Sequence, residues 1–276
     1  MALCTKQNNK SEQHNMWKPQ LLALLSLAAC DGLNTFETSP TTSDPNAPLT
    51  LSSAAGKTYV PAGPTMITAN GFDVVGDRSA TIQVVSSKQI NVNGVPLLAD
   101  ATGTTFRSAD GTYVMQVASS IDGVSTDQIL YMLASEQVGG QSLATAYVMG
   151  NATPASGIPT SGTAVYTGKM TVVDDLGNAQ TMAGPVLVVS LDTADVNGSF
   201  SFAQTTVSLA QTKMSNGSFF TTVSSAEAQP IVTGTIDGTM FGATGQEIGG
   251  TVGLQYNPNG TPNQSYIGYY GATTTP

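Results

Sequence analysis

Short runs of alternating apolar and polar residues, separated by turn residues, fill most of the chain from Tyr59 onward. Alternation with a period of two places successive side chains on opposite faces of a strand. Turn signals recur at intervals of about eight to twelve residues, which is typical of all-β proteins. No segment carries a helical stripe longer than about two turns. The pattern therefore predicts an all-β fold built from many short strands.

The first group of predicted strands lies in a β-rich, handle-like region, residues 56–156. A hairpin is expected to turn at Ala109-Asp110-Gly111, because Asp-Gly favours the backbone conformations of tight hairpin turns. The predicted strands of this region are Ala80–Ser86, Gln89–Val95, the two arms of Phe106–Ser119, Asp127–Ser135 and Ser142–Gly150.

A second region, residues 157–276, follows the segment Asn151–Gly162, in which two prolines and two glycines indicate a boundary. In Thr163–Val173 the residues Tyr166, Met170 and Val172 share one face of a predicted strand. Further predicted strands are Gly184–Thr193, Ser199–Val207, Ser218–Ser225, Pro230–Gly238, Gly238–Gly242, Gly249–Tyr256 and Gln264–Gly271, with turns at Asp174–Asn178 and Ala194–Gly198. About eight strands of this length predict a closed, eight-stranded antiparallel β-barrel, because closure removes exposed edges.

The apolar run Leu21–Ala29 is too short to span a bilayer as a helix, which takes about 20 residues. Its length and small final residues instead predict a secretory signal at residues 1–29, with Met16 as an alternative start. Leu27-Ala28-Ala29-Cys30 resembles the lipobox of bacterial lipoproteins. This resemblance implies cleavage before Cys30 and acylation (palmitate among the acyl groups) of that residue. The alternative is a buried free cysteine in a helix.

Residues 30–55 are expected to form the lipidated end and a tether. Glu37–Thr50 is rich in proline, serine and threonine and has too few large apolar residues for a core. A tether behind a lipid anchor places the protein in the bacterial cell envelope, with the outer membrane and surface exposure as the favoured location. Asp31 leaves inner-membrane retention open, because enteric bacteria read aspartate there as a retention signal.

Charge and residue types exclude several functions. Charged residues make up 10% of the chain and the formal net charge is −9; removing Lys6, Lys10, Lys18 and Glu12 with the signal makes it about −11. An acidic surface argues against nucleic acid. The same cleavage removes Cys4, His14 and Trp17, and with them the usual catalytic triads and most zinc sites. We therefore expect no enzyme, no catalytic residue, no metal and no cofactor.

Three other motifs have simpler explanations than ligand binding. The glycine-rich Gly242–Gly250 lacks the Lys-Ser/Thr ending of a phosphate-binding loop. The acidic pairs Asp174-Asp175 and Asp192/Asp195 have too few ligands for calcium and are predicted to serve turns. The tyrosines include potential axial haem ligands, but none is singled out by its position.

Two stretches and the chain end resemble the transferrin-binding protein B-like lipoproteins of Gram-negative bacteria. Gly157–Gly168 resembles the segment that opens their barrel, and Gly238–Gly253 resembles its late signature. The closing Tyr266–Ala272 resembles its last strand. The signature residues are Tyr166, Gly168, Phe241, Gly242, Glu247, Gly249 and Gly250, and we expect structural roles for them, with Glu247 as a hydrogen-bond acceptor that orders a loop and the two glycines permitting a bulge or a close backbone approach.

The resemblance implies a surface or envelope lipoprotein whose barrel presents loops to a protein or small solute. Known members bind iron-carrying host proteins, haem-bearing proteins or complement regulators, so iron or haem acquisition is one expectation. Transferrin-binding protein B itself has two lobes, each with a handle and a barrel, whereas this chain has one.

The leading hypothesis is therefore a monomeric, lipid-anchored binding protein. Its contacts are expected on the loops Asp174–Asn178, Lys213–Ser218 and Asn257–Gln264, because loop tips carry recognition in such scaffolds. The first alternative is a structural or adhesive envelope lipoprotein with no specific solute. The second is an integral outer-membrane barrel, which the lipobox and the short strands argue against.

Overall fold

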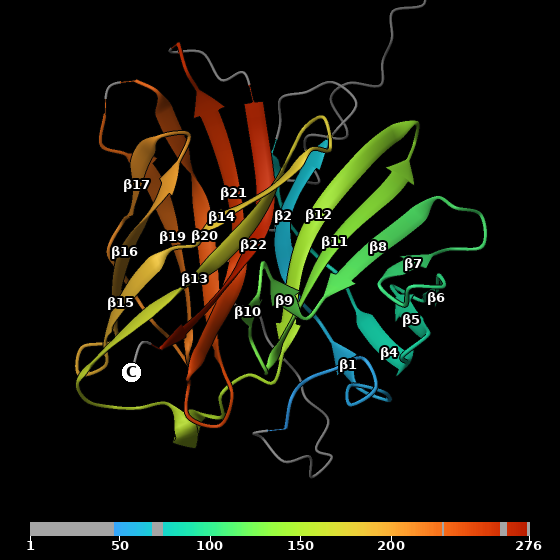
Figure 1. The fold of residues 1–276 in the computed structure, drawn as a ribbon, viewed down its shortest axis with the longest axis horizontal. Helices are drawn as coiled ribbons and strands as arrows, with labels where there is room; N and C mark the ends of the chain where they lie inside the picture. Colours follow the sequence, from blue (N-terminus) through green and yellow to red (C-terminus); the bar gives the residue numbers. More distant parts are fainter. Residues whose placement is uncertain (1–46, 68–73, 228, 260–263, 275–276) are drawn as a thin grey trace, which may run out of the picture. The chain divides into compact units, whose positions relative to one another are not determined.

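The computed structural model describes residues 47–67, 74–227, 229–259 and 264–274. These residues belong to one compact unit, 33–276. Nearly all of the regular structure is antiparallel β-sheet, in two large sheets (Figure 1). The 3-10 helix η1 (Ala155–Gly157) is a single short turn, and within the described ranges no helix has the length and apolar character needed to cross a membrane. The all-β fold is confirmed.

The first sheet, which we call the handle sheet, has ten strands in the order β1-β4-β5-β6-β7-β8-β11-β12-β2-β3. Its strands are β1 (Thr58–Tyr59), β2 (Ala62–Ile67), β3 (Val74–Ser79), β4 (Ile82–Ser86), β5 (Gln89–Val92), β6 (Val95–Ala99), β7 (Thr105–Arg107), β8 (Tyr113–Ala118), β11 (Ile129–Val138) and β12 (Gln141–Gly150). A small hairpin, β9 (Ser120–Ile121) and β10 (Val124–Ser125), stands apart.

The second sheet closes on itself. Its strands are β13 (Thr163–Asp174), β14 (Ala179–Ala183), β15 (Val186–Ser190), β16 (Asp195–Phe202), β17 (Thr205–Leu209), β18 (Thr212–Lys213), β19 (Ser218–Ser225), β20 (Ile231–Phe241), β21 (Glu247–Asn257) and β22 (Gln264–Thr274). Pairing of β13 with β22 completes a ring of eight strands; β14 and β18 pair only at its margin. The predicted eight-stranded antiparallel barrel is confirmed.

Several predicted strand boundaries were wrong. Ser199–Val207 is not one strand but the hairpin β16–β17, which turns at Ala203 and Gln204 with positive φ at both residues. Sequence patterns miss this turn because alanine and glutamine rarely adopt that conformation. The turn expected at Ala194–Gly198 ends at Ala194, because β16 already begins at Asp195. Pro230–Gly238 and Gly238–Gly242 form the single strand β20, and Gln89–Val95 runs across the turn between β5 and β6. The short strands β1, β2, β3, β6, β9, β10, β14 and β18 were not predicted.

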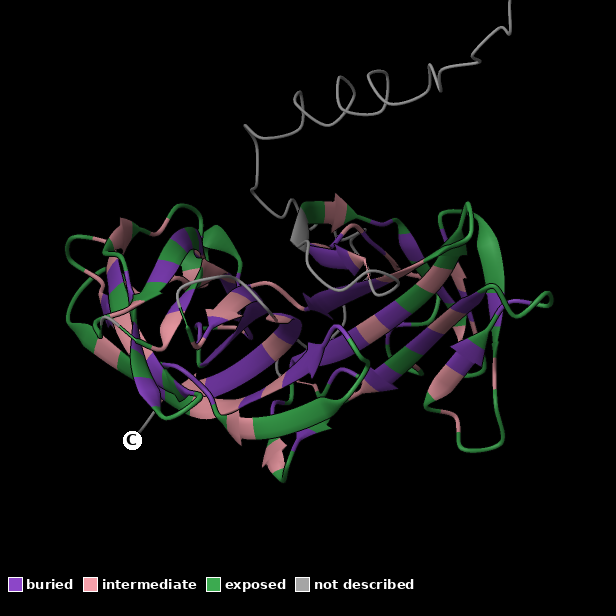
Figure 2. Ribbon diagram, turned by 90° about the horizontal axis from the view of Figure 1, so that it is seen from above, coloured by how far each residue is buried: buried purple, intermediate pink, exposed green. Residues whose placement is uncertain are grey.

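Alternation along the barrel strands fills the interior with side chains. Tyr166, Met170 and Val172 of β13 point into the same core as Phe200 and Phe202 of β16. Figure 2 shows buried and exposed residues alternating along these strands. An eight-stranded barrel is just wide enough for its own side chains, so this interior is a packed core.

The handle sheet curves around a second core. Alternate residues of β4, β5, β8, β11 and β12 supply Ile82, Ile90, Met115, Met132 and Met149, all nearly inaccessible to solvent. The segment before β1 contributes Leu49 and Ala54, which cover one end of this core. Burial of about 1.5–3 kcal/mol per large apolar side chain makes each core a substantial source of stability.

Two smaller clusters join the sheets. Ile129, Tyr131 and Val148 of the handle pack with Phe241 of β20, and Met66 and Ala144 pack with Ile267 of β22. Strands β21 and β22 are therefore buried on both faces, one against the barrel interior and one against the handle. The sequence of a strand covered on both faces is a continuous run of apolar or small residues rather than an alternation, which explains the glycine-rich sequence of β21.

Candidate functional site

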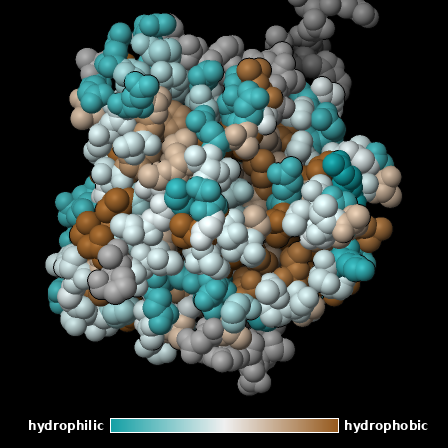
Figure 3. Space-filling model, viewed as in Figure 1, coloured by the Kyte–Doolittle hydropathy of each residue, from teal (hydrophilic) through white to brown (hydrophobic). Residues whose placement is uncertain are grey.

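A groove with a volume of about 1070 Å³ opens at one end of the handle core. Four segments form it: residues 50–52, 87–88, 99–105 and 116–120. Leu130 of β11 and Tyr269 of the barrel strand β22 also line it. Figure 3 shows brown, pale and teal residues intermixed on the handle side of the molecule in that view. The volume lies at the upper end of the range of small-molecule sites, about 300–1,000 Å³.

The 99–105 wall is shaped by Asp100. Its carboxylate accepts hydrogen bonds from the Thr102 backbone N–H (3.0 Å), the Thr102 hydroxyl (2.6 Å) and the Gly103 N–H (3.0 Å). The Thr102 hydroxyl bond is the main reason why the pKa of Asp100 is lowered. The local sequence favours this arrangement, because aspartate readily bonds the backbone two residues ahead. The carboxylate is thus occupied in holding the loop.

A pair of tyrosines lies beside the groove. Tyr269, partly exposed, stacks on the buried Tyr131 with ring centroids 5.2 Å apart and planes inclined by 24°. The Tyr131 hydroxyl is bonded to the Thr126 hydroxyl at 2.6 Å. Burial raises the pKa of both tyrosines, so both hydroxyls stay protonated at neutral pH. The stack gives the groove a rigid aromatic surface.

Four other polar side chains of the groove are available as hydrogen-bond donors and acceptors. Within the described ranges, the side chains of Ser87, Gln116, Ser119 and Ser120 make no hydrogen bond to another residue. All four residues are exposed. The only charged residues along the groove are Lys88 and Asp100. The site is therefore nearly neutral and rich in hydroxyl groups.

The junction between the sheets positions the groove. Glu247 of β21 accepts hydrogen bonds from the backbone N–H groups of Asp127 (2.7 Å) and Gln128 (3.0 Å), just before β11. Burial is the main reason why the pKa of Glu247 is raised, and it outweighs the lowering effect of these two hydrogen bonds. Gln128 in turn donates to the Ala47 carbonyl at 3.0 Å and accepts from Asn151 at 2.9 Å. Glu247 thus ties the start of β11, and with it Leu130, to the barrel.

The other signature residues lie at or near this junction. Phe241 is fully buried in the cluster with Ile129 and Tyr131, and the Gly242 N–H donates to the Asn151 carbonyl at 2.9 Å. A Cβ on Gly249 would lie 2.8 Å from Ile129 Cδ1, and one on Gly250 would lie 2.0 Å from the Asp237 carbonyl oxygen. Both glycines therefore allow neighbouring residues to approach the β21 backbone closely. Strand β21 continues through them without a register shift, so they form no bulge against β22.

Tyr166 and Gly168 hold the barrel seam. The Tyr166 hydroxyl donates to the Gly245 carbonyl at 2.6 Å, and burial raises the pKa of this tyrosine to about 12. A Cβ on Gly168 would lie 1.9 Å from the Gly271 carbonyl oxygen, so β13 and β22 approach closely only without it. Cys30 lies outside the described residues.

Asp237 is a second carboxylate at the junction. Its oxygens accept from the Thr251 N–H at 2.9 Å and from the Thr251 hydroxyl. Burial is the main cause that raises its pKa to about 7, with a smaller contribution from the nearby Asp77 of β3. A neutral carboxyl group is favoured where desolvation opposes charge.

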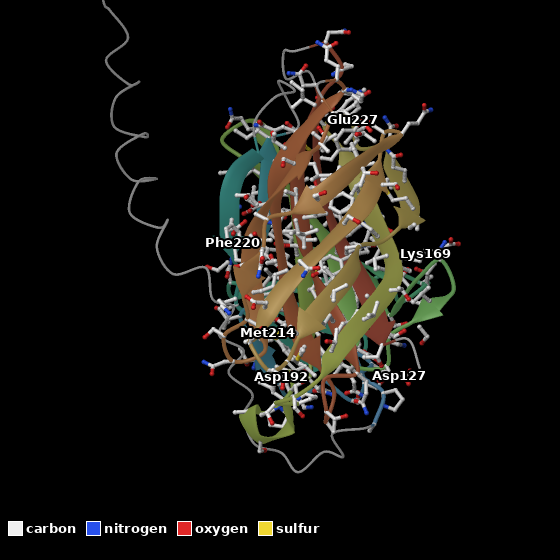
Figure 4. The ribbon with its side chains drawn as sticks, turned by 90° about the vertical axis from the view of Figure 1, so that its left-hand side faces the viewer. Asp127, Lys169, Asp192, Met214, Phe220 and Glu227 are labelled. Atoms are coloured by element: carbon white, nitrogen blue, oxygen red, sulfur yellow. The ribbon has the colours of Figure 1, made fainter. Side chains whose placement is uncertain are left out.

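The three loops expected to bind a ligand do not converge. Strand directions place Asp174–Asn178 and Asn257 at one end of the barrel and Lys213–Ser218 at the other. Figure 4 shows Met214 and Asp192 toward one end and Glu227 at the opposite end. Asp174 is buried and accepts from the Leu176 N–H (3.0 Å) and the Asn178 N–H (2.7 Å), so it serves its turn. Residues 260–263 lie outside the described residues.

Sequence reasoning missed the groove. Its residues come from six separate places in the chain and carry no catalytic or metal-ligating motif. Asp100-Ala101-Thr102-Gly103 signals a turn, but nothing local indicates that this turn faces residues 50–52 and Tyr269. In the part of the chain that the structure describes, no cluster of three His, Cys, Asp or Glu side chains is placed to hold a metal ion.

Comparison with known proteins supports the fold. No family model matches the chain, and no curated protein does. Among solved structures, transferrin binding protein B from Haemophilus parasuis Hp5, a vaccine antigen, matches 79% of this chain with a TM-score of 0.51 at 14% identity. Isotype 1 of the same protein from serogroup B Neisseria meningitidis gives the same three values. Intact Ap-TbpB, with N and C lobes, matches 78% at 14% identity and a TM-score of 0.51.

The likeness has a defined extent. The chain spans 45%, 44% and 46% of these three proteins, less than half of each. Identity this low concerns the fold alone. The chain has a fold similar to that of part of transferrin binding protein B, a binding protein rather than an enzyme.

Proposed function

We propose that this protein is a lipid-anchored binding protein of the bacterial cell envelope, held through Cys30 at the outer membrane. The observation that carries the proposal is the groove of about 1070 Å³, because it offers a shaped surface on a rigid two-sheet scaffold. The similarity of the fold to part of transferrin binding protein B supports a binding role. The lipobox-like Leu27-Ala28-Ala29-Cys30 supports the anchor.

Attachment through acyl chains suits an acidic chain. The formal net charge of −9 opposes electrostatic binding to anionic lipid. Several acyl chains anchor a protein far more stably than one, without any charged patch. Iron or haem acquisition is the process to test first, because the structural neighbours are named for binding transferrin.

The first experiment is mass spectrometry of the N-terminus from the native membrane fraction. We expect an acylated Cys30 as the first residue, and Cys30→Ser should release the protein from the membrane. Protease shaving of intact cells should degrade the barrel if it is surface-exposed. An unmodified N-terminus at Met1 or Met16, with the protein in the cytosol, would contradict the proposed anchor and location.

The ligand is then sought by capture. The purified protein is incubated with material from iron-limited cultures or host fluids, with the Gln116→Ala/Ser119→Ala/Ser120→Ala variant alongside. Binding should be saturable, and the variant should weaken it because these three side chains line the groove. Saturable capture that the variant leaves unchanged would place the site elsewhere. No saturable ligand would favour the structural or adhesive alternative.

A further inference from the structure

We propose that the groove binds a neutral, hydroxyl-rich glycan chain. The inference rests on the proposed function and specifies the chemical class of its ligand. The structure combines at one place the three features that uncharged sugars need: an aromatic surface, free hydroxyl and amide groups, and almost no net charge.

The aromatic surface is Tyr269. A pyranose ring presents C–H groups on one face, and these pack favourably on the electron-rich face of an aromatic ring. Tyr269 is partly exposed and lines the groove, and its stacking on Tyr131 holds the ring in one orientation. The Tyr131–Thr126 hydrogen bond fixes the lower ring of the stack. A rigid ring loses little conformational freedom when a sugar binds.

The polar partners are suited to sugar hydroxyls. Each sugar hydroxyl both donates and accepts a hydrogen bond, so it is best matched by groups that do the same. The serine hydroxyls of Ser87, Ser119 and Ser120 donate and accept, and the Gln116 amide offers two donors and an acceptor. Within the described ranges these side chains make no hydrogen bond to other residues. They are free to bond a ligand or ordered water.

The charge of the groove argues against anionic ligands. Recognition of phosphate or carboxylate usually uses arginine or several cations, and the groove has only Lys88. Asp100 opposes that charge, and its carboxylate already accepts three bonds from its own loop. The acidic net charge of the whole chain also repels polyanions. A neutral chain of sugars satisfies the groove better than a nucleotide or a sulfated glycan.

The test uses the full chain in detergent with defined probes. Cellohexaose, maltohexaose and chitohexaose are the neutral probes, and heparin is the charged comparison. Binding is followed by saturation-transfer NMR and by calorimetry. We expect saturable binding of at least one neutral probe, with the strongest transfer from tyrosine protons, and no binding of heparin. Failure of all three neutral probes, or tighter binding of heparin, would overturn the inference.

Matched variants localise the site. Tyr269→Ala should raise Kd by about tenfold or more, whereas Tyr269→Phe keeps the ring and should change Kd by about twofold or less. Gln116→Ala/Ser119→Ala/Ser120→Ala alters only exposed side chains and should also raise Kd about tenfold. Thr206→Ala/Ser208→Ala, on exposed positions of the barrel strand β17, is the control and should bind normally. Equal affinity of the triple variant and the control would overturn the groove as the site.

The two proposals fail in different ways. If the neutral probes fail while the triple variant still abolishes capture of a natural ligand, the glycan inference is wrong and the binding function stands. If the protein is found unacylated in the cytosol, the proposed envelope function is wrong whatever the probes show.

Discussion

At the scale of single residues, glycine controls how closely the two sheets approach. Gly249 faces Ile129 of the handle, and a Cβ there would lie 2.8 Å from Cδ1 of that isoleucine. Ile129 is fully buried, so it has little room to move aside. The position therefore tests whether the junction is as tightly packed as a protein core.

We predict that Gly249→Ala lowers the free energy of unfolding by about 1–3 kcal/mol, the usual cost of overpacking. Ile129→Val alone removes the methyl group in contact and should cost about 0.5–1.5 kcal/mol. The double variant should be more stable than the sum of the two losses predicts, because the valine makes room for the new methyl group. Urea unfolding of all four proteins measures this. Simple additivity would show that the two residues do not meet.

Asp237 gives the junction a pH dependence with a defined sign. The pKa of Asp237 is about 7 in the folded protein and about 4 in the unfolded chain. Between these two pH values the folded state holds a proton that the unfolded chain has released. The stability contributed by this group is thus present at acid pH and is lost as the pH rises from about 4 to about 7. The groups around it are Asp77, which raises its pKa, and Thr251, which lowers it.

We predict that Asp237→Asn removes this loss, because the amide is neutral at every pH. Its oxygen can accept from the Thr251 N–H, and its NH2 group can donate to the Thr251 hydroxyl, which reverses that second bond. Urea midpoints from about pH 4 to about pH 8 should show the variant gaining on the natural protein as the pH rises. Asp110→Asn is the matched control. Hydrogen bonds from Ser108 and Thr112 hold the pKa of Asp110 at about 2, so its charged carboxylate stabilises the folded protein at neutral pH. Asp110→Asn should therefore lower the urea midpoint at neutral pH. Parallel pH curves for Asp237→Asn and the natural protein would contradict the prediction.

At the scale of elements, Glu247 links a barrel strand to the start of β11. Glutamine at this position keeps one acceptor oxygen but replaces the other with a donor, which leaves one of two backbone N–H groups unpaired. An unpaired buried N–H costs about 1–3 kcal/mol.

We therefore predict that Glu247→Gln destabilises the protein by about that amount. Hydrogen exchange should quicken at the amides of Asp127 and Gln128, while β15 and β16, which do not pair with β21, keep their protection. Unchanged exchange at residues 127–128 would show that the two hydrogen bonds carry no energy.

The turn of the β16–β17 hairpin, in contrast, is made of residues that do not favour its backbone conformation, so a substitution can stabilise it. Ala203 and Gln204 have φ of 48° and 66°, both in the left-handed region, and both side chains are exposed. Replacing them with Asn-Gly, the preferred pair for such turns, should raise stability by about 1–2 kcal/mol. Thermal unfolding measures the gain; a loss of stability would mean that the turn is not of this type.

These elements also show what the sequence could and could not predict. Period-two alternation predicted β13, with Tyr166, Met170 and Val172 inward, because the barrel core selects apolar residues at every second position. The same alternation joined β16 to β17, because Ala203-Gln204 carries no turn signal. The groove could not be predicted, since it brings together residues as far apart in the sequence as Leu51 and Tyr269. The side chains that matter there, serine and glutamine, are also ordinary surface residues.

At the scale of the whole molecule, β21 and β22 pack on one face in the barrel core and on the other against the handle sheet. Their inward residues, such as Ile248 and Tyr270, pack in the barrel, and their outward residues, such as Ile267, pack against the handle. Unfolding of either sheet would expose apolar surface on these strands. We predict a single transition in urea, with far-UV circular dichroism and tyrosine fluorescence giving the same midpoint. Two separated transitions would show that the handle and the barrel are energetically independent.

The seam between β13 and β22 has a consequence for the order in which the molecule can be built. A chain leaves the ribosome N-terminus first, and β22 is the last strand in chain order among the described residues. Neither the ring of the barrel nor its cover by the handle is complete until these residues emerge. Until then the barrel sheet stays open beside β13, and Met66 and Ala144 of the handle lack their packing partner Ile267. The barrel therefore closes only after nearly all of the described chain has been made.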